Sequence, residues 1–247
     1  MTGAETPPAP LRTLVTGAAG GIGAAVAAAL RGRGDHVVGL DRVDDVDIIG
    51  VDLADDRRRV EVVEQVIRTW GGIDVLVNVA GVFAPGGVTD SDPSDWRPVW
   101  AVDLEAPLHL MRLCAPTMVA QGFGRIVNVT SVHARSGSPG CLAYDVAKAG
   151  LEAGTRSAAI DLGRSGVLVN AVAPGFVRTA MSTLADGTDE TESAPFVATY
   201  VDGGKLPLGR GARAGEIAPA VLFLTARENT YVTGSVVTVD GGLTATF

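Results

Sequence analysis

Two residue types that are scarce in this chain lie one helical turn apart, and together they could move a proton. The chain has three tyrosines and two lysines, yet Lys148 follows Tyr144 by four residues. On a helix, this spacing places both side chains on one face. An ammonium beside a phenol favours the phenolate, which can act as a general base. The pair is therefore a candidate proton-transfer group, although an ordinary exposed helical pair would have the same spacing.

A glycine-rich segment is suited to binding phosphate. It runs from Gly17 through Gly21, Ile22 and Gly23, between an apolar strand-like run and an alanine-rich helical stretch. Glycines leave the backbone open to a pyrophosphate, and the following helix N-terminus offers free N–H groups and a positive dipole end. This turn predicts a dinucleotide site, with a glycine turn made only for close packing as the alternative.

The end of the second expected strand bears on the choice of cofactor. A carboxylate at Asp41 can accept hydrogen bonds from ribose hydroxyls and would repel a 2′-phosphate, which favours NAD over NADP. Arg42 beside it could instead bind that phosphate. Asp52 and Leu53 are candidate adenine contacts, unless Asp52 is the N-cap of the helix that starts near Asp55.

Short apolar runs alternate with longer helical patterns along the chain and must position these residues. Strands are expected at residues 13–16, 37–40, 75–78, 126–130, 167–172 and 236–239, with a further short strand before Asp52. The runs are rich in Val, Ile and Leu without alternation, which is typical of a parallel sheet covered on both faces. The pattern predicts an α/β fold, a single-domain Rossmann-type doubly wound parallel sheet with helices on both faces.

One domain is expected over residues 11–247, preceded by a mobile Pro- and Ala-rich tail at residues 1–10. Residues 179–213 break the alternation and carry the acidic residues Asp186, Asp189, Glu190 and Glu192 without a clear period. We expect a mobile insertion there, either a lid over a ligand site or a solvated loop.

Composition narrows the function classes. The chain has 247 residues, 47% of them hydrophobic, and a formal net charge of −8, which disfavours binding to nucleic acid or an anionic membrane. Its two cysteines are too few for a disulfide framework, and no metal ligand set is expected. The first ten residues show no targeting signal, so we expect a cytoplasmic protein.

Taken in order along the chain, these residues resemble the short-chain dehydrogenase/reductase family. The matching segments, which lie within residues 11–242, are Thr16-Gly17-x-x-x-Gly21-Ile22-Gly23, Asn78-Val79-Ala80-Gly81, Ser131, Tyr144-x-x-x-Lys148, Pro174-Gly175 and Val239-Asp240-Gly241-Gly242.

The resemblance implies a role for each matching residue. Tyr144 would exchange the hydroxyl proton, Ser131 would hydrogen-bond the substrate oxygen, and Lys148 would hold the nicotinamide ribose. The residues that it places at the cofactor are Asn78, Ala80, Gly81, Tyr144, Lys148, Pro174, Gly175, Val177 and Thr179. Ser131 could otherwise be a strand-end capping residue.

One position departs from the family pattern. The family usually has an asparagine that holds a water in a proton relay to the lysine, and this chain has Asp103 there. An ionised Asp103 would partly neutralise Lys148, or it would hold the same water as an acceptor. We count Asp103 among the catalytic candidates and expect the chemistry to survive with a higher optimum pH.

The expected substrate pocket lies around Ser131, His133, Arg135, Cys141 and Tyr144. His133 or Arg135 could bind an anionic group of the substrate, or both could be surface loop residues. The span from Asp41 to Asp52, between the second and third strands, is too short for a full helix. In this feature and in its aspartate-type nucleotide site, the chain is similar to dehydrogenases of cyclic diols such as 2,3-dihydro-2,3-dihydroxybenzoate dehydrogenase.

The predicted function is an NAD(H)-dependent oxidoreductase that acts on a secondary alcohol or ketone, with a small cyclic or polyhydroxylated molecule as substrate. A 3-oxoacyl-thioester reductase using NADPH is one alternative. A dinucleotide-binding protein with impaired catalysis is another, because of Asp103. The family resemblance also implies a homotetramer.

Overall fold

A parallel sheet of seven strands forms the centre of the computed structural model, which describes residues 9–245. Its strands are β1 (Arg12–Thr16), β2 (His36–Asp41), β3 (Ile48–Gly50), β4 (Val75–Asn78), β5 (Gly124–Val129), β6 (Val167–Pro174) and β9 (Val236–Val239). Their spatial order is β3-β2-β1-β4-β5-β6-β9, and every neighbouring pair is parallel. This order confirms the predicted doubly wound α/β fold.

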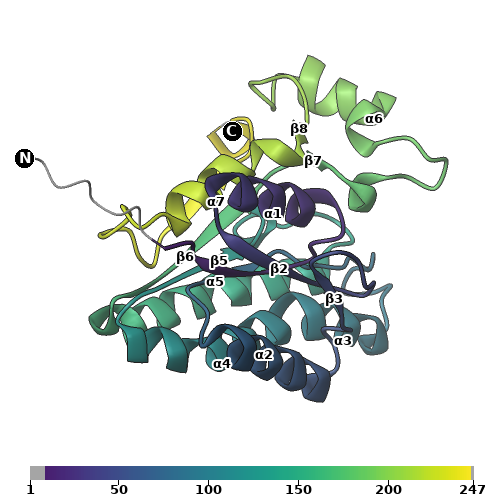
Figure 1. Ribbon diagram of the computed structural model, residues 1–247. Helices are drawn as coiled ribbons and strands as arrows, with labels where there is room; N and C mark the ends of the chain where they lie inside the picture. The colour runs from purple at the N-terminus through teal and green to yellow at the C-terminus, as the bar shows by residue number, and fades with distance from the viewer. Residues whose placement is uncertain (1–8, 246–247) are drawn as a thin grey trace, which may run out of the picture.

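Helices cover both faces of the sheet (Figure 1). Those on one face are α1 (Gly21–Arg33) and α7 (Ala218–Thr225), and those on the other are α2 (Asp56–Trp70), α4 (Ala106–Gln121) and α5 (Leu142–Leu162). Each layer has its own apolar cluster: Leu14 of β1 belongs to one and its neighbour Val15 to the other, and neither side chain is exposed. Burial on both faces explains why the strands lack apolar–polar alternation.

The observed strands lie where the sequence predicts them, with small differences at their ends. β4 and β9 have the expected bounds, and β3 follows β2 with no helix between them. β6 extends to Pro174 because β9 pairs with it that far, through Pro174 and Val239. Such extensions depend on a neighbouring strand, which local sequence does not reveal.

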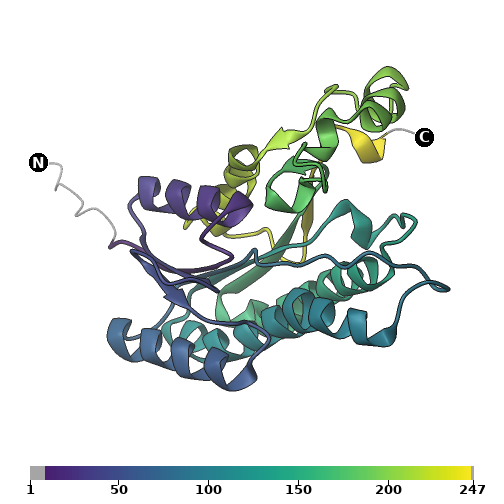
Figure 2. The ribbon, with the colours of Figure 1, turned by 90° about the vertical axis from the view of Figure 1, so that its right-hand side faces the viewer.

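The insertion after β6 consists largely of short helical turns. Its base is a two-stranded pair, β7 (Val177–Arg178) with β8 (Ala212–Arg213), and α6 (Ala194–Phe196) continues into a π-helical turn at Val197–Asp202. The segment stands apart from the two helix layers and lies beside the C-terminal segment (Figures 1 and 2). Three aromatic rings hold it together, those of Phe176, Phe196 and Tyr200, whose centroids lie 4.7–4.8 Å apart.

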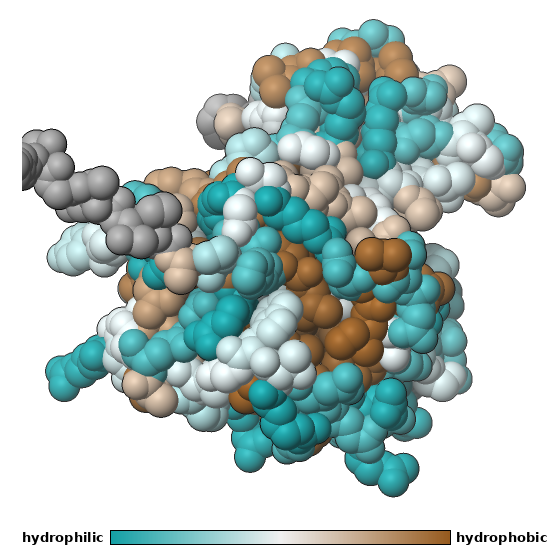
Figure 3. All heavy atoms as spheres, viewed as in Figure 1, coloured by the Kyte–Doolittle hydropathy of each residue, from teal (hydrophilic) through white to brown (hydrophobic). Residues whose placement is uncertain are grey.

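The ends and the surface bear on the remaining expectations. Of the expected tail, residues 1–8 lie outside the described residues, and residues 9 and 10 belong to no helix or strand. Between residues 9 and 245, no helix has the length and apolar content needed to cross a membrane. In Figure 3, hydrophilic side chains cover much of the lower helices, and apolar ones show near the centre of the view.

A polar network joins β1 to the start of β4 at the amino end of the sheet. The Arg12 guanidinium donates to both carboxylate oxygens of Asp74, at 2.8 and 2.7 Å, and Gln121 at the end of α4 donates to the same carboxylate at 3.0 Å. Burial by itself would raise the pKa of Asp74, but the hydrogen bonds and charge of Arg12 outweigh it and lower that pKa.

Replacing Asp74 by asparagine should therefore lower the free energy of unfolding and make that free energy less dependent on pH in the acidic range. We expect the free energy of unfolding at neutral pH to fall by about 1–3 kcal/mol, the range for charged hydrogen bonds. Because the folded-state pKa lies below the unfolded value of about 3.9, the contribution is complete above that pH and is lost as the pH falls through the folded pKa. Urea unfolding from pH 7 to pH 2 would measure it, with Asp161→Asn on the exposed side of α5 as the control. Equal acid dependence in Asp74→Asn and the parent chain would contradict this account.

Candidate active site

The glycine turn between β1 and α1 has a backbone that larger residues could not adopt. Gly17 has a φ of +67°, and a Cβ there would lie 3.0 Å from the backbone of Ala80. A Cβ at Gly23 would lie 2.0 Å from the carbonyl oxygen of Gly17. The turn is therefore a close-packed cradle with its backbone uncovered, and it fits a dinucleotide pyrophosphate at the N-terminus of α1.

Two other segments meet this turn. The hydroxyl of Thr16 accepts hydrogen bonds from the backbone N–H groups of Val79 and Ala80, at 2.9 and 3.0 Å, which fixes the segment after β4 against β1. From the far side, Thr179 approaches Gly21 so closely that a Cβ there would lie 3.2 Å from its methyl group. The structure thus brings Ala80 and Thr179 to the glycine turn, beyond the carboxyl ends of the strands where such sheets bind ligands.

The Asp41 carboxylate lies at the edge of the glycine turn. One of its oxygens accepts a hydrogen bond from the backbone N–H of Ala19 at 3.0 Å, and the other accepts one from the backbone N–H of Arg42 at 2.7 Å. The Arg42 residue itself is exposed. The carboxylate is therefore oriented by the turn that would hold the pyrophosphate, as the predicted ribose contact requires.

The structure shows that Asp52 is not the N-cap of the following helix. Helix α2 begins at Asp56, and its N-cap is Asp55. The Asp55 carboxylate accepts hydrogen bonds from the backbone N–H groups of Arg57 and Arg58, at 3.0 and 3.1 Å. Asp52 is too far from the first turn for that role, and it accepts instead from the N–H of Ala54 at 2.9 Å. The N-cap interpretation was therefore wrong.

The other predicted cofactor residues differ in accessibility. Leu53 and Val177 are buried in the apolar clusters. Asn78 is also buried, and its amide donates to Asn128 at 2.8 Å, which in turn donates to Thr155 of α5 at 2.9 Å. This chain of hydrogen bonds joins β4 and β5 to α5, so it fixes the helix that carries Tyr144 and Lys148 against the sheet.

The segment after β6 packs closely against the segment after β9. Pro174 is buried, and a Cβ on Gly175 would lie 2.8 Å from the Cβ of Asp240. The terminal Asp-Gly-Gly segment therefore packs directly on the Pro-Gly segment, and both lie at the edge of the site.

Lys148 forms a buried ion pair with the residue that departs from the family pattern. Its ammonium lies 3.0 Å from the Asp103 carboxylate and donates to the carbonyl of Val129 at 3.2 Å. The exposed fractions of the two side chains are 3% and 0%. Burial by itself would lower the pKa of Lys148, but the charge of Asp103, and then that of Tyr144, outweigh it and raise that pKa.

The position of Asp103 depends on an irregular helix. α3 (Pro93–Trp100) and α4 are joined by a π-helical turn at Ala101–Glu105, and Asp103 lies at its centre. Its second oxygen accepts from the backbone N–H of Val82 at 2.8 Å. Gly81 is pressed against the ion pair, since a Cβ there would lie 2.9 Å from the Asp103 carboxylate and 3.4 Å from the Lys148 ammonium.

Tyr144 lies beside this pair, with its ring edge-on to two others. The ammonium of Lys148 is 5.4 Å from its ring centroid, and the rings of Phe83 and His133 are each 5.8 Å away. Ser131 is buried at the end of β5, where its hydroxyl accepts from the N–H of His133 at 3.2 Å and caps a short 3₁₀ helix. Ser131 is therefore the N-cap of the 3₁₀ helix, and the same bond orients its hydroxyl.

A cavity of about 300 Å³ opens next to these residues. It is lined by Val132, His133, Ser136, Ser138, Gly175, Phe176, Tyr200, Leu243 and Thr244. Tyr200, Leu243 and Thr244 were not predicted, because they come from the insertion and the C-terminal segment and no spacing connects them to the motifs. Phe176 was not predicted either, although it directly follows the Pro174-Gly175 motif.

The predicted substrate residues have different surroundings. His133 lines the cavity, and its Nδ1 lies 2.7 Å from the Asp145 carboxylate. Arg135 is not among the lining residues, and its Nε donates to Glu152 of α5 at 3.1 Å. Cys141 is partly buried just before α5. The structure thus brings His133 into the pocket and pairs Arg135 elsewhere.

Removing the carboxylate alone should destabilise the chain strongly. In Asp103→Ala, the buried ammonium of Lys148 loses its counter-charge, and we expect a loss of about 3–5 kcal/mol in the free energy of unfolding. The double variant Asp103→Leu/Lys148→Met, which removes both charges, should recover most of that loss. Denaturant unfolding of the parent, the single variants Asp103→Leu and Lys148→Met, and the double variant would measure the coupling. Additive losses would show that the two groups do not depend on each other.

Comparison with known proteins agrees with this geometry. The model of a family described as enoyl-(acyl carrier protein) reductase matches residues 17–244. A 3-oxoacyl-[acyl-carrier-protein] reductase of Thermotoga maritima is 36% identical over 245 residues, covering 93% of this chain and 96% of that protein. A trans-4-hydroxycyclohexanecarboxylate dehydrogenase of Sinomonas cyclohexanicum is 33% identical over 254 residues, covering 94% and 92%.

Solved structures resemble the fold closely. A protein described as an NAD(P)-dependent gluconate 5-dehydrogenase of Beutenbergia cavernae, with NADP bound at low occupancy, superimposes with a TM-score of 0.86. It is 33% identical, and the match covers 95% of this chain and 97% of that one. With the glycine turn, the Tyr144–Lys148 pair and the strand order, these matches show that the chain belongs to the short-chain dehydrogenase/reductase family and is an oxidoreductase of alcohols and ketones.

Proposed function

We propose that the protein is an NAD(H)-dependent oxidoreductase that acts on the secondary alcohol or ketone group of a small cyclic or polyhydroxylated molecule. The observation that carries this proposal is the small cavity of about 300 Å³, which has hydroxyl-bearing side chains in its wall and is lined by His133, whose ring lies 5.8 Å from that of Tyr144. This volume is at the lower end of small-molecule sites, and Ser136, Ser138 and Tyr200 supply groups that can hydrogen-bond substrate hydroxyls.

The residues would divide the work between binding and proton transfer. When bound, the nicotinamide supplies or accepts the hydride. Ser131 and Tyr144 hydrogen-bond the substrate oxygen, and Tyr144 takes or returns its proton. Val129 accepts one N–H of Lys148 and Asp103 pairs with its charge, so an N–H remains that can be donated to a ribose hydroxyl.

Asp103 takes a direct part in the electrostatics of this site. An asparagine would be neutral, whereas the carboxylate pairs with Lys148 and offsets the positive charge that favours a phenolate at Tyr144. We infer that the reaction proceeds with an alkaline optimum. Asp103 has a second possible role in place of the family asparagine, because its carboxylate can accept a hydrogen bond from a water that relays protons to Lys148.

The proposed cofactor is NAD, because of the oriented carboxylate of Asp41. Its hydrogen bond from Ala19 places it against the glycine turn, where it would accept from ribose hydroxyls and repel a 2′-phosphate. The NADP in the structure of the Beutenbergia cavernae protein favours the opposite choice. Exposed Arg42 is the residue that would then bind the phosphate.

The second candidate is a 3-oxoacyl-thioester reductase that uses NADPH. The observation in its favour is the 36% identity to the Thermotoga maritima reductase. The net charge of −8 disfavours the basic docking face that an acidic carrier protein requires. A dinucleotide-binding protein with impaired catalysis is a third candidate, and it is motivated by Asp103 alone.

We further propose a cytoplasmic homotetramer that turns over a small molecule and binds no nucleic acid or membrane. The assembly rests on the family resemblance, and it is consistent with the exposed apolar side chains Leu108 of α4 and Val146 and Ile160 of α5. We propose that the insertion at residues 179–213 acts as a lid, because its Tyr200 lines the cavity.

Cofactor choice is tested by titrating the protein with NADH and with NADPH, followed by fluorescence. We expect NADH to bind more tightly, and Asp41→Asn to weaken NADH binding roughly tenfold or more, since a charged hydrogen bond is lost. Arg42→Ala is the matched control and should leave NADH binding unchanged. Tighter binding of NADPH, abolished in Arg42→Ala, would instead favour the thioester reductase.

The pH dependence of turnover tests the role of Asp103. In Asp103→Asn, the positive charge of Lys148 is no longer offset by a carboxylate, so we expect the acidic limb of the pH–rate profile to move to lower pH. The assay uses a panel of cyclic alcohols, polyols and hydroxyketones, with Tyr144→Phe as the inactive baseline. Superimposable acidic limbs would contradict the electrostatic role, and cofactor binding without turnover on any substrate would favour the third candidate.

A further inference from the structure

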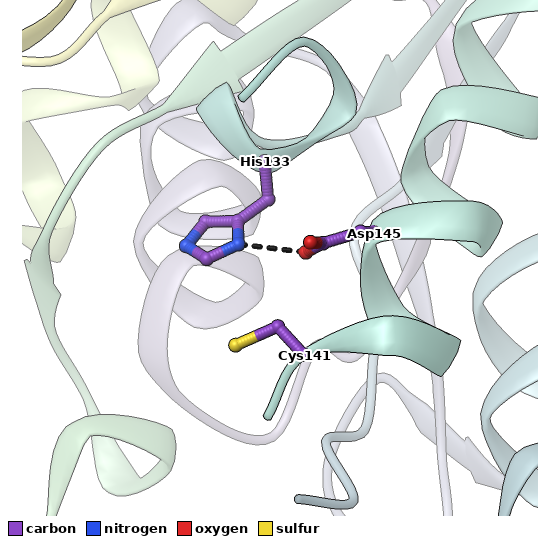
Figure 4. A group of neighbouring side chains, drawn as sticks. All are labelled: His133, Cys141 and Asp145. Atoms are coloured by element: carbon purple, nitrogen blue, oxygen red, sulfur yellow. Dashed lines mark hydrogen bonds and ion pairs between the residues drawn. The ribbon is translucent and has the colours of Figure 1, made fainter. Parts of the chain in front are cut away.

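Three side chains of different chemistry lie close together (Figure 4), and one of them, His133, lines the cavity. They are His133 in the 3₁₀ helix after β5, Cys141 directly before α5, and Asp145 in the first turn of α5. A ring nitrogen of His133, the Sγ of Cys141 and a carboxylate oxygen of Asp145 all lie within 4.8 Å of one another. All three residues are partly exposed, so solvent ions can reach them.

The bonds that these groups now make are replaceable. The carboxylate of Asp145 shares a hydrogen bond of 2.7 Å with His133, and it accepts from the N–H of Ser138 at 3.3 Å. The thiol of Cys141 donates only a long bond, 3.6 Å, to the carbonyl of Pro139. Small shifts of these side chains would turn all three donor atoms toward one point.

We propose that His133, Cys141 and Asp145 form a binding site for Zn²⁺ or a similarly soft divalent cation. Sulfur, imidazole nitrogen and carboxylate oxygen are the ligands that zinc prefers, whereas Mg²⁺ and Ca²⁺ prefer oxygen alone. Three protein ligands leave one tetrahedral position for water or substrate. On binding, the thiol releases its proton to solvent and the imidazole keeps its proton on Nε2, so one thiolate and one carboxylate balance the charge of the ion.

An ion at this site would inhibit the enzyme rather than assist it. His133 lines the cavity, and its ring lies edge-on to that of Tyr144, with centroids 5.8 Å apart. Ser138, whose N–H bonds to Asp145, also lines the cavity. The ion would therefore reach the space that the substrate needs and add positive charge beside the proton-transfer residue. This consequence rests on the proposed function, whereas the site itself does not.

Cobalt binding tests the site without any substrate. The full chain, free of a polyhistidine tag, is titrated with Co²⁺, and we expect one ion per chain with thiolate-to-cobalt charge-transfer absorption that Zn²⁺ abolishes. Cys141→Ser should lose this absorption, and Asp145→Asn should weaken binding roughly tenfold or more. Cys114→Ala, which removes the other cysteine, is the matched control and should bind as the parent does. Absence of the absorption in the parent, or its persistence in Cys141→Ser, would overturn the proposal.

Inhibition is measured separately on whichever substrate the protein turns over. We expect Zn²⁺ to compete with substrate and a chelator to restore the rate, with a roughly tenfold higher inhibitory concentration for Cys141→Ser. Inhibition of the parent and Cys141→Ser at the same zinc concentration would refute the inhibitory role. A protein that binds Co²⁺ through Cys141 but has no turnover would refute the proposed function and leave the metal site standing.

Discussion

A buried positive charge needs a counter-charge, and this requirement organises the centre of the molecule. Lys148 is buried on α5, the helix that also carries Tyr144, where its ammonium reaches the end of β5, and Asp103 supplies the counter-charge. The pair holds together α5, the α3–α4 helix and the segment after β4, since Asp103 also accepts from Val82. An unpaired charge that is so deeply buried would be costly. The segments that carry Lys148 and Asp103 must therefore keep the relative positions that hold the two charges together.

The same ion pair explains why the backbone nearby is so restricted. Gly81 has no room for a side chain beside the two charges, and the π-helical turn is what brings Asp103 to them. At the other side of the site, the glycine turn is pressed against Ala80. The segment after β4 therefore contacts both the glycine turn and the Asp103–Lys148 pair, and it fixes the distance between them.

Several residues of the candidate site hold one another in place. Ser131 caps a short helix through His133, and His133 is held by Asp145. Asn78 supports α5 through Asn128 and Thr155 rather than through direct exposure to a ligand. Such bonds orient the side chains before substrate arrives, which lowers the cost of ordering them on binding.

By itself, the sequence determined the fold class, the glycine turn and the Tyr144–Lys148 pair, because each depends on residues near one another in the chain. Apolar runs reveal buried parallel strands, and four-residue spacing places side chains on one helix face. Only the tertiary structure decided which distant groups meet. The pairing of Asp103 with Lys148, the loss of Arg135 to Glu152 and the N-cap at Asp55 rather than Asp52 follow from packing. The cavity wall supplied by Tyr200 and Thr244, and the convergence of Cys141 with His133 and Asp145, likewise depend on how separate elements fold together.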